Sequence, residues 1–365
     1  MTTDASGGLP LPEIDGLLTA EESRQTAEAI AEWQLPSGMI PWFPGGHADA
    51  WNHVEAAMAL DIGGLRAESE RAYEWLVGLQ RPDGAWHQYY VSDDAGQISV
   101  EQDKLDANVC AYLACGVWHH FLRHKDAGFL EAMWPTVERA IDFVLDLQTP
   151  RGEILWARHA DGSPWTFALL TGSSSICHSL RAAIGIAREV GHERSDWERS
   201  ASALSHVVAN VPDAFAPKHR WAMDWYYPVL AGAVTGERGR THLEDRYETF
   251  AKEDKGIRCV SDRPWITTAE TCECALAYLS VGMRDRALEL FTHAQTQRLD
   301  DGRYWTGIVY PQEVHFPADE TSTYSAAAVL LAAEALHGAT GGASLFVDHD
   351  DVLPVLPEHT PDDTL

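Results

Sequence analysis

The stretch LQRPDGAW, residues 79–86, is the best-formed copy of a short phrase that returns along this chain. Its defining residues are Gln80, Gly84 and Trp86. Looser copies read QLPSGMIPW (34–42), QTPRGEILW (148–156) and QRLDDGRYW (297–305). Each copy stands where one helical pattern stops and before the next begins. An internal repeat of this kind predicts an architecture assembled from repeated helical units.

Two kinds of helical pattern alternate between these copies. In the first kind, apolar residues recur at helical spacing and charges occupy the other face. These amphipathic segments are 18–34, 65–80, 129–148, 195–211, 241–253 and 283–297. The second kind is rich in Ala, Gly and Cys all round, which indicates burial on several sides. These segments are 50–64, 105–122, 173–190, 223–234, 269–282 and 323–336.

Six outer and six inner helices in strict alternation predict an all-α protein with an (α/α)6 toroid, a barrel of six helical hairpins. An open helical solenoid is the alternative. We favour the closed ring because polar and aromatic residues gather at one end of every inner helix. The expected organisation is an N-terminal arm at 1–17, one toroid domain at 18–338 and a flexible C-terminal tail at 339–365, which is rich in Gly, Asp and Pro.

Charge and composition narrow the possible partners. The 365 residues include 27 Lys and Arg against 55 Asp and Glu, a formal net charge of -28. This balance argues against binding to nucleic acid or to an anionic membrane surface. We find no apolar run of about 20 residues that would predict a transmembrane segment. The N-terminus lacks signal-peptide features, and the six cysteines show no secreted-scaffold spacing. We expect a soluble, cytoplasmic protein.

All inner helices of such a ring point the same way, so their N-termini and the loops before them should surround one mouth. An aromatic bowl with a few carboxylates and histidines is typical of a small-molecule site. The predicted substrate-binding residues are Trp42, His47, Asp49, Trp51, Trp86, Asp103, Trp225, Tyr226, Tyr227, Trp265, Trp305 and Tyr324. Each also has a structural interpretation, because acids cap helix starts and aromatic rings close barrel ends.

The segment LQRPDGAW, followed by DANVCAYLACGVW (106–118), resembles the terpenoid cyclase and protein prenyltransferase toroids, which carry the QW motif. The resemblance implies an isoprenoid substrate and an aromatic bowl that stabilises carbocations through ring faces. The D-x-D-D acid of protonating cyclases has its only match at 348–351, in the predicted tail. The prenyltransferase pattern further implies zinc held by Glu270, Cys272 and His315, as a weaker alternative to no cofactor and no metal.

A second stretch, KDAGFLEAMWPTVERAIDFVLDLQTPRG (125–152), resembles the six-hairpin glycosidases, which share the toroid. That resemblance implies cleavage of a sugar by a carboxylate pair, one acting as acid and the other as base or nucleophile. Asp106, Glu270 and Glu320 are the best catalytic candidates, because they open three different inner helices.

The QW-like repeat is the most specific of these signals. We therefore expect a prenyltransferase-like or terpenoid-cyclase-like enzyme acting on a small isoprenoid in a central aromatic and acidic cavity. Asp106, Glu270 or Glu320 would supply or receive the proton. Two alternatives stay open, a six-hairpin glycoside hydrolase and a non-catalytic binding module, since a fold does not settle a function.

Overall fold

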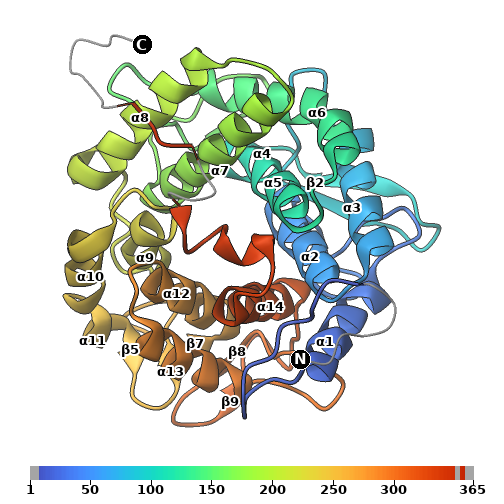
Figure 1. The fold of residues 1–365 in the computed structure, drawn as a ribbon, viewed down its shortest axis with the longest axis vertical. Helices are drawn as coiled ribbons and strands as arrows, with labels where there is room; N and C mark the ends of the chain where they lie inside the picture. The colour runs from blue at the N-terminus through green and yellow to red at the C-terminus, as the bar shows by residue number, and fades with distance from the viewer. Residues whose placement is uncertain (1–7, 350–353, 358–365) are drawn as a thin grey trace.

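The alternating patterns fold into two concentric sets of helices in the computed structural model, which describes residues 8–349 and 354–357. Six inner helices surround the centre (Figure 1). They are α2 (Ala50–Ile62), the pair α4 (Ala107–Ala111) and α5 (Leu113–His124), α7 (Leu170–Glu189), α9 (Met223–Leu230), α12 (Thr268–Ser280) and α14 (Thr323–His337). The last inner helix, α14, contacts the first, α2, and closes the ring.

The outer set lies around this ring. It consists of α1 (Ala20–Trp33), α3 (Arg66–Leu79), α6 (Ala127–Leu145), α8 (Ser195–Asn210), α10 (Gly236–Glu244) and α13 (Arg284–Gln295). The predicted (α/α)6 toroid is therefore confirmed. None of the described helices is long and apolar enough to cross a membrane.

Two helices differ from the prediction. The outer helix expected at 241–253 begins five residues earlier as α10, breaks after Glu244, and resumes as the single turn α11 (Tyr247–Phe250). In place of the single inner helix expected at 105–122, the chain forms the two-residue strand β3 (Leu105–Asp106) and then two helices, α4 and α5, which are divided at Tyr112.

Short antiparallel strands, which the helical periodicity did not predict, occupy the loops before the inner helices. The pairs are β1 (Tyr89–Ser92) with β2 (Ile98–Gln102), β3 with β4 (Ala157–Arg158), and β5 (Ala251–Lys252) with β6 (Gly256–Ile257). A three-stranded sheet joins β7 (Trp265–Thr267), β8 (Gly307–Val309) and β9 (Val314–His315). Because β3 and β7 lead directly into α4 and α12, they fix where those inner helices begin.

The repeated Gln–Gly–Trp motif links neighbouring outer helices through hydrogen bonds. The Gln80 side-chain amide donates to Gly84 O within its own turn and to Thr136 O on α6, both at 2.9 Å. Gly84 has φ +89°, and a Cβ there would lie 2.1 Å from Arg139 O, so only glycine permits this approach. The copies beginning at Gln34 and Gln148 repeat both bonds, to residues on α3 and α8 respectively.

The chain after α14 folds back into the ring rather than away from it. Figure 1 shows this red segment inside the circle of inner helices. It contains the short 3-10 helix η2 (Gly341–Ser344), followed by buried Leu345 and Phe346. His178 on α7 hydrogen-bonds to Leu345 O at 3.0 Å and stacks on Phe346. This part of the predicted flexible tail is thus packed, because its apolar side chains complete the core at the C-terminal ends of the inner helices.

The other limits of the predicted domains have mixed support. In the predicted arm, Ile14 is buried, and Pro12 O accepts a hydrogen bond from Ser23 on α1 at 2.7 Å. The last two acids of the D-x-D-D match, at 350 and 351, lie outside the described residues. The boundaries at 17 and 338 stay a prediction.

Candidate active site

Carboxylates stand at or near the starts of several inner helices, and they raise the pKa of two neighbouring tyrosines. Burial raises the pKa of Tyr89, and the charges of Asp49 and Asp106 raise it further. In the same way, burial raises the pKa of Tyr324, with added contributions from Glu270 and Glu320. Tyr89 and Tyr324 both lie against the Trp42 ring, at centroid distances of 5.8 and 5.0 Å, so the four acids near them border one region.

Asp49 caps α2 and is enclosed. It accepts hydrogen bonds from the backbone N–H of Asn52 at 3.0 Å, from the Asn52 side chain at 2.8 Å and from Trp42 Nε1 at 2.7 Å. Burial raises its pKa. The Trp42 ring in turn contacts His47, Tyr89 and Tyr324 at centroid distances of 4.5, 5.8 and 5.0 Å. Trp42 thus joins the first inner hairpin to the last.

Asp106 caps α4 and lies beside a cation. Its Oδ1 accepts from Asn108 N at 3.1 Å, and its Oδ2 lies 3.5 Å from Lys104 Nζ. Burial raises the Asp106 pKa, and Lys104 opposes that shift. Lys104 also sits 3.9 Å from the centre of the Trp156 ring, a cation–π contact that holds an aromatic face next to the carboxylate. Asp103, by contrast, is exposed at the rim.

Glu270 and Glu320 are half-buried and enter from α12 and from the loop before α14. Thr267 Oγ1 donates a hydrogen bond to Glu270, and Thr306 Oγ1 donates to Glu320 at 2.9 Å. α12 contacts α9 and α14, whereas α4 contacts α2 and α7. The helices that carry Asp106 and Glu270 are therefore on opposite sides of the ring.

A second acidic layer lies deeper along α2 and α12, and the sequence analysis did not select it as catalytic. Glu55 on α2 accepts from Trp51 Nε1 at 2.9 Å and from the Tyr112 hydroxyl at 3.0 Å. Glu273 on α12 accepts from the hydroxyls of Tyr226 and Tyr227. Glu273 follows Glu270 by one turn and Glu55 follows Asp49 by six residues, both in inner helices otherwise rich in Ala, and these spacings were the available signal.

These two deep carboxylates share a protein environment that favours their neutral forms. Burial raises the pKa of Glu55 to about 7. Burial also raises the pKa of Glu273 well above its usual range, and the charge of Glu55 adds to that effect. Both line a small pocket at the centre of the ring, which Leu331 and Phe346 close from the apolar side.

Several predicted substrate-binding residues do not face the mouth. Trp86 is fully buried and donates Nε1 to Leu76 O at 2.9 Å, so it packs the repeat turn. Trp225 is also fully buried, stacks on Phe250 and donates to His242 O behind α9. The Tyr226 ring is enclosed and reaches the site through its hydroxyl alone.

The remaining predicted aromatic residues retain some exposure or border the pocket. Trp51 packs edge-on against Tyr227, with ring centroids 6.0 Å apart. Trp305 stacks on His315 at 3.8 Å, and half-buried Trp265 donates Nε1 to Phe316 O at 3.0 Å. His47 stacks on Tyr89 at 4.0 Å and pairs with Glu101. The roles of these side chains in substrate binding stay a prediction.

The zinc ligands implied by the prenyltransferase pattern are not brought together. Cys272 is fully buried. Among the described residues, the groups of three His, Cys, Asp or Glu ligand atoms within 4.8 Å of one another do not include Glu270, Cys272 and His315. The three side chains do not converge because Cys272 is directed into the helix packing while Glu270 borders the mouth.

Comparison with known proteins identifies the chemistry of relatives. The chain is 47% identical to the "MMP endo-(1,4)-3-O-methyl-alpha-D-mannosidase" of Mycolicibacterium hassiacum over 336 residues, which cover 92% of each protein. No family model matches the chain. This relationship overturns the expectation of a prenyltransferase or terpenoid cyclase and favours the glycoside hydrolase alternative.

Solved structures share the architecture at low sequence identity. A wild-type glycosidase superposes with a TM-score of 0.65 at 13% identity, covering 92% of this chain and 97% of the other. A GH63 mannosylglycerate hydrolase from Thermus thermophilus gives a TM-score of 0.65 at 11% identity, covering 84% and 98%. At these identities the likeness shows the toroid fold alone.

Proposed function

The chain belongs to the same glycosidase family as the Mycolicibacterium hassiacum mannosidase, and on this premise we propose that it hydrolyses internal (1→4) bonds in oligosaccharides of 3-O-methyl-α-D-mannose. The observation that carries the proposal is the 47% identity across 92% of both chains. A mouth that combines carboxylates with aromatic rings supports it, because sugar rings stack on aromatic faces while the acids act on the glycosidic bond.

In the proposed mechanism, Asp106 and Glu270 act from opposite sides of the ring. Asp106 is the proton donor to the glycosidic oxygen, since burial raises its pKa and favours the protonated form. Glu270 assists attack at the anomeric carbon, and water supplies the hydroxyl of the new reducing end. Glu320 remains the third candidate and would orient Thr306 and the start of α14.

Aromatic side chains would provide the substrate platform. Trp42, Trp51 and Trp156 are half-buried at or near the mouth carboxylates. Each methyl ether buried against such rings contributes about 0.8 kcal/mol, so its loss should weaken binding about fourfold. We further propose that this chemistry needs no cofactor, because two carboxylates suffice for the reaction. We also propose that it takes place in the cytoplasm.

The test is hydrolysis of a (1→4)-linked 3-O-methyl-α-D-mannose oligosaccharide by the wild type and by Asp106→Asn and Glu270→Gln. Loss of a general acid or base should lower the rate about 10²–10⁴-fold while the circular dichroism spectrum is retained. Glu131→Gln, which changes an exposed acid on α6, is the matched control. Full activity in both site variants would refute the assignment, and a wild type that leaves the methylated oligosaccharide intact would refute the proposed function.

A further inference from the structure

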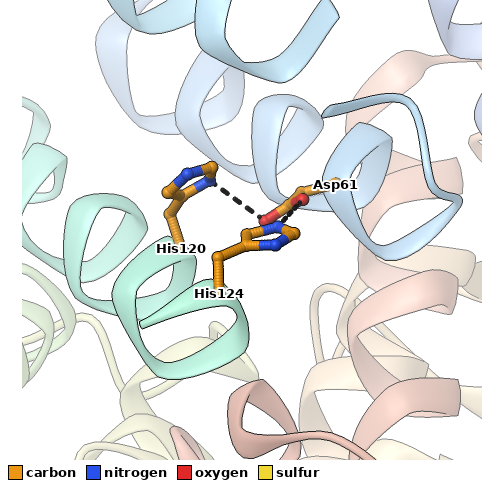
Figure 2. Close-up of side chains that lie close together, drawn as sticks. All are labelled: Asp61, His120 and His124. Atoms are coloured by element: carbon orange, nitrogen blue, oxygen red, sulfur yellow. Dashed lines mark hydrogen bonds and ion pairs between the residues drawn. The ribbon is translucent and has the colours of Figure 1, made fainter. Parts of the chain in front are cut away.

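A cluster of three metal-binding side chains lies at the end of the ring opposite the mouth. Figure 2 shows the carboxylate of Asp61, near the C-terminus of α2, facing the rings of His120 and His124, which are one turn apart at the end of α5. Their ligand atoms all lie within 4.8 Å of one another. The mouth is formed by the N-termini of the same inner helices, so this cluster is separate from the candidate active site.

His120 is a buried histidine whose ring nitrogens both face carboxylates. Its side chain is 1% exposed, and its two ring nitrogens form ion-pair contacts with Asp61 and Glu70. Its Nδ1 lies 3.2 Å from Asp61 Oδ2 without hydrogen-bond geometry. Two ligands of a tetrahedral zinc ion with bonds of about 2.0–2.1 Å lie about 3.3 Å apart. The spacing therefore suits two atoms that share an ion.

His124 supplies the third donor. Its Nε2 lies 2.6 Å from Asp61 Oδ1, and its side chain is 14% exposed, which gives access from solvent. A bound ion would replace this hydrogen bond. The spacing of four residues places both imidazoles on one face of α5. The C-terminal ends of α2 and α5 also favour positive charge, because helix dipoles end there with exposed carbonyls.

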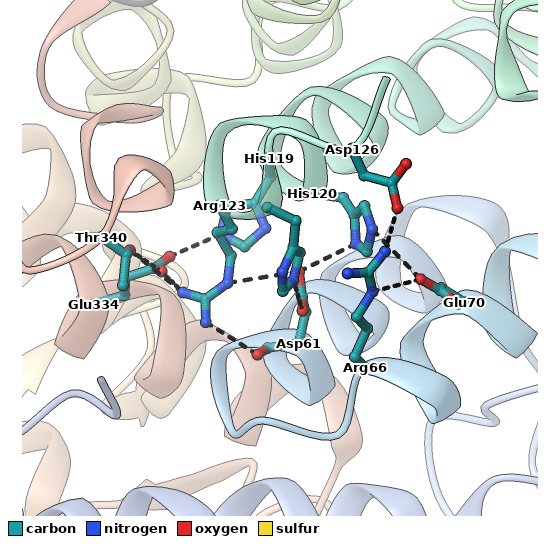
Figure 3. A network of polar contacts seen from close by, with 10 residues as sticks. Asp61, Arg66, Glu70, His119, His120, Arg123, Asp126, Glu334 and Thr340 are labelled. Atoms are coloured by element: carbon teal, nitrogen blue, oxygen red, sulfur yellow. Dashed lines mark hydrogen bonds and ion pairs between the residues drawn. The ribbon is translucent and has the colours of Figure 1, made fainter. Parts of the chain in front are cut away.

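Residues around the three side chains could orient them as metal ligands. Metal-bound histidines usually direct their other ring nitrogen to a carboxylate, and ligating carboxylates receive further hydrogen bonds. Glu70 Oε1 lies 3.7 Å from His120 Nε2. Arg123 donates a hydrogen bond to the backbone O of Asp61 at 3.1 Å, and its Nε forms an ion pair with Asp61 Oδ2 at 3.5 Å. Figure 3 shows this outer layer, in which Glu334 pairs with Arg123 and thereby offsets its charge.

We propose that Asp61, His120 and His124 form a structural binding site for a divalent transition metal, with zinc the best fit. Two imidazoles and one carboxylate are a zinc ligand set, and imidazole selects zinc, copper or nickel over magnesium and calcium. The ion would join the first inner helix to the second behind the active site. It would add stability without taking part in catalysis.

Zinc binding to the chelator-treated full-length protein tests the proposal. Equilibrium dialysis with ZnCl2 at pH 7.5 should give one tightly bound equivalent for the wild type, and zinc should raise the melting temperature. His124→Gln should bind this equivalent at least tenfold more weakly. His119→Gln is the matched control, because His119 lies on the same helix and pairs with Glu334 at 2.7 Å outside the three ligands. Acidification should weaken binding, because protons compete with a metal ion for its ligands.

Two results would overturn the site: zinc uptake by the wild type no greater than by His124→Gln, or a wild-type melting temperature unchanged by zinc. Circular dichroism and the rate of oligosaccharide hydrolysis check that His124→Gln is folded. Should that variant fail to fold, Co²⁺ binding to the wild type decides, since a tetrahedral nitrogen and oxygen site gives cobalt a visible absorption band. Absence of that band at saturating cobalt would equally refute the site.

Discussion

At the scale of single residues, the repeated glutamines and glycines explain the sequence phrase without reference to catalysis. The Gln80 amide bridges two carbonyls on different segments, and Gly84 lets its turn approach the backbone of α6. The Gln–Gly–Trp motif is therefore explained by the contact between outer helices. Such contact is needed in any closed ring of helical hairpins, whatever its substrate.

Gly84→Ala should destabilise the protein strongly. Its φ of +89° strains an L-residue, and the added Cβ would meet Arg139 O at 2.1 Å, so we expect a loss of about 3 kcal/mol in unfolding free energy. Gly96→Ala has φ +79° with nothing within 4 Å and should cost about 1 kcal/mol. Urea unfolding measures both. Equal losses would show that the close approach to Arg139 is unimportant.

The deep carboxylate Glu55 should make stability depend on pH. Its folded pKa of about 7 is above the ordinary value of 4.5, so the folded state holds the proton more tightly. This contribution is full below pH 4.5 and is lost as the pH rises towards 7, by an amount on the order of 3 kcal/mol. Glu55→Gln removes the ionisation.

Urea unfolding of the wild type and Glu55→Gln at pH 5 and pH 8 tests this linkage. The unfolding free energy of the variant minus that of the wild type should be more positive at pH 8 than at pH 5. A difference between the two proteins that does not change with pH would contradict the raised pKa.

At the scale of elements, the alternation of amphipathic and small-residue segments predicted most helices because each set has its own burial pattern. The strands were missed because pairs such as β3 and β4 are two residues long, below what periodicity can detect. The packing after α14 was missed because local composition does not record that Leu345 and Phe346 complete a distant core. Likewise Trp86 and Trp225 fit an aromatic bowl by position but point into helix packing.

Phe346→Ala tests whether the segment after α14 belongs to the core. Phe346 borders the central pocket and stacks on His178, so truncation should cost about 3 kcal/mol of unfolding free energy. Val355→Ala, at a side chain that is 71% exposed, should change it by less than about 0.5 kcal/mol. Thermal and urea unfolding give the comparison. A Phe346→Ala protein as stable as the control would mean that the segment is dispensable.

At the scale of the whole molecule, the sequence predicted the ring but ranked the wrong chemistry first. The same toroid serves isoprenoid and sugar enzymes, so the outcome depends on which groups face the mouth. Single positions along a helix do not show this orientation. The 47% identical relative supplied the distinction.

The net charge of -28 should also make stability depend on salt. Self-repulsion destabilises a compact chain, and raising ionic strength from 0.01 to 0.15 M shortens the Debye length from about 30 to about 8 Å. We expect sodium chloride to raise the melting temperature at pH 7.5. The rise should shrink near pH 5, close to the isoelectric point of about 4.8. Calorimetry that finds no rise at pH 7.5 would contradict this.

The segment after α14 closes the end of the ring opposite the mouth, so the ring is a cup, open at one end, rather than a tube. A long glycan cannot be threaded through a cup, so under the proposed function it would lie across the rim with both ends in solvent. Each cut would release two fragments through the opening by which the substrate arrived. Cleavage would then proceed by independent encounters instead of stepwise sliding along one chain.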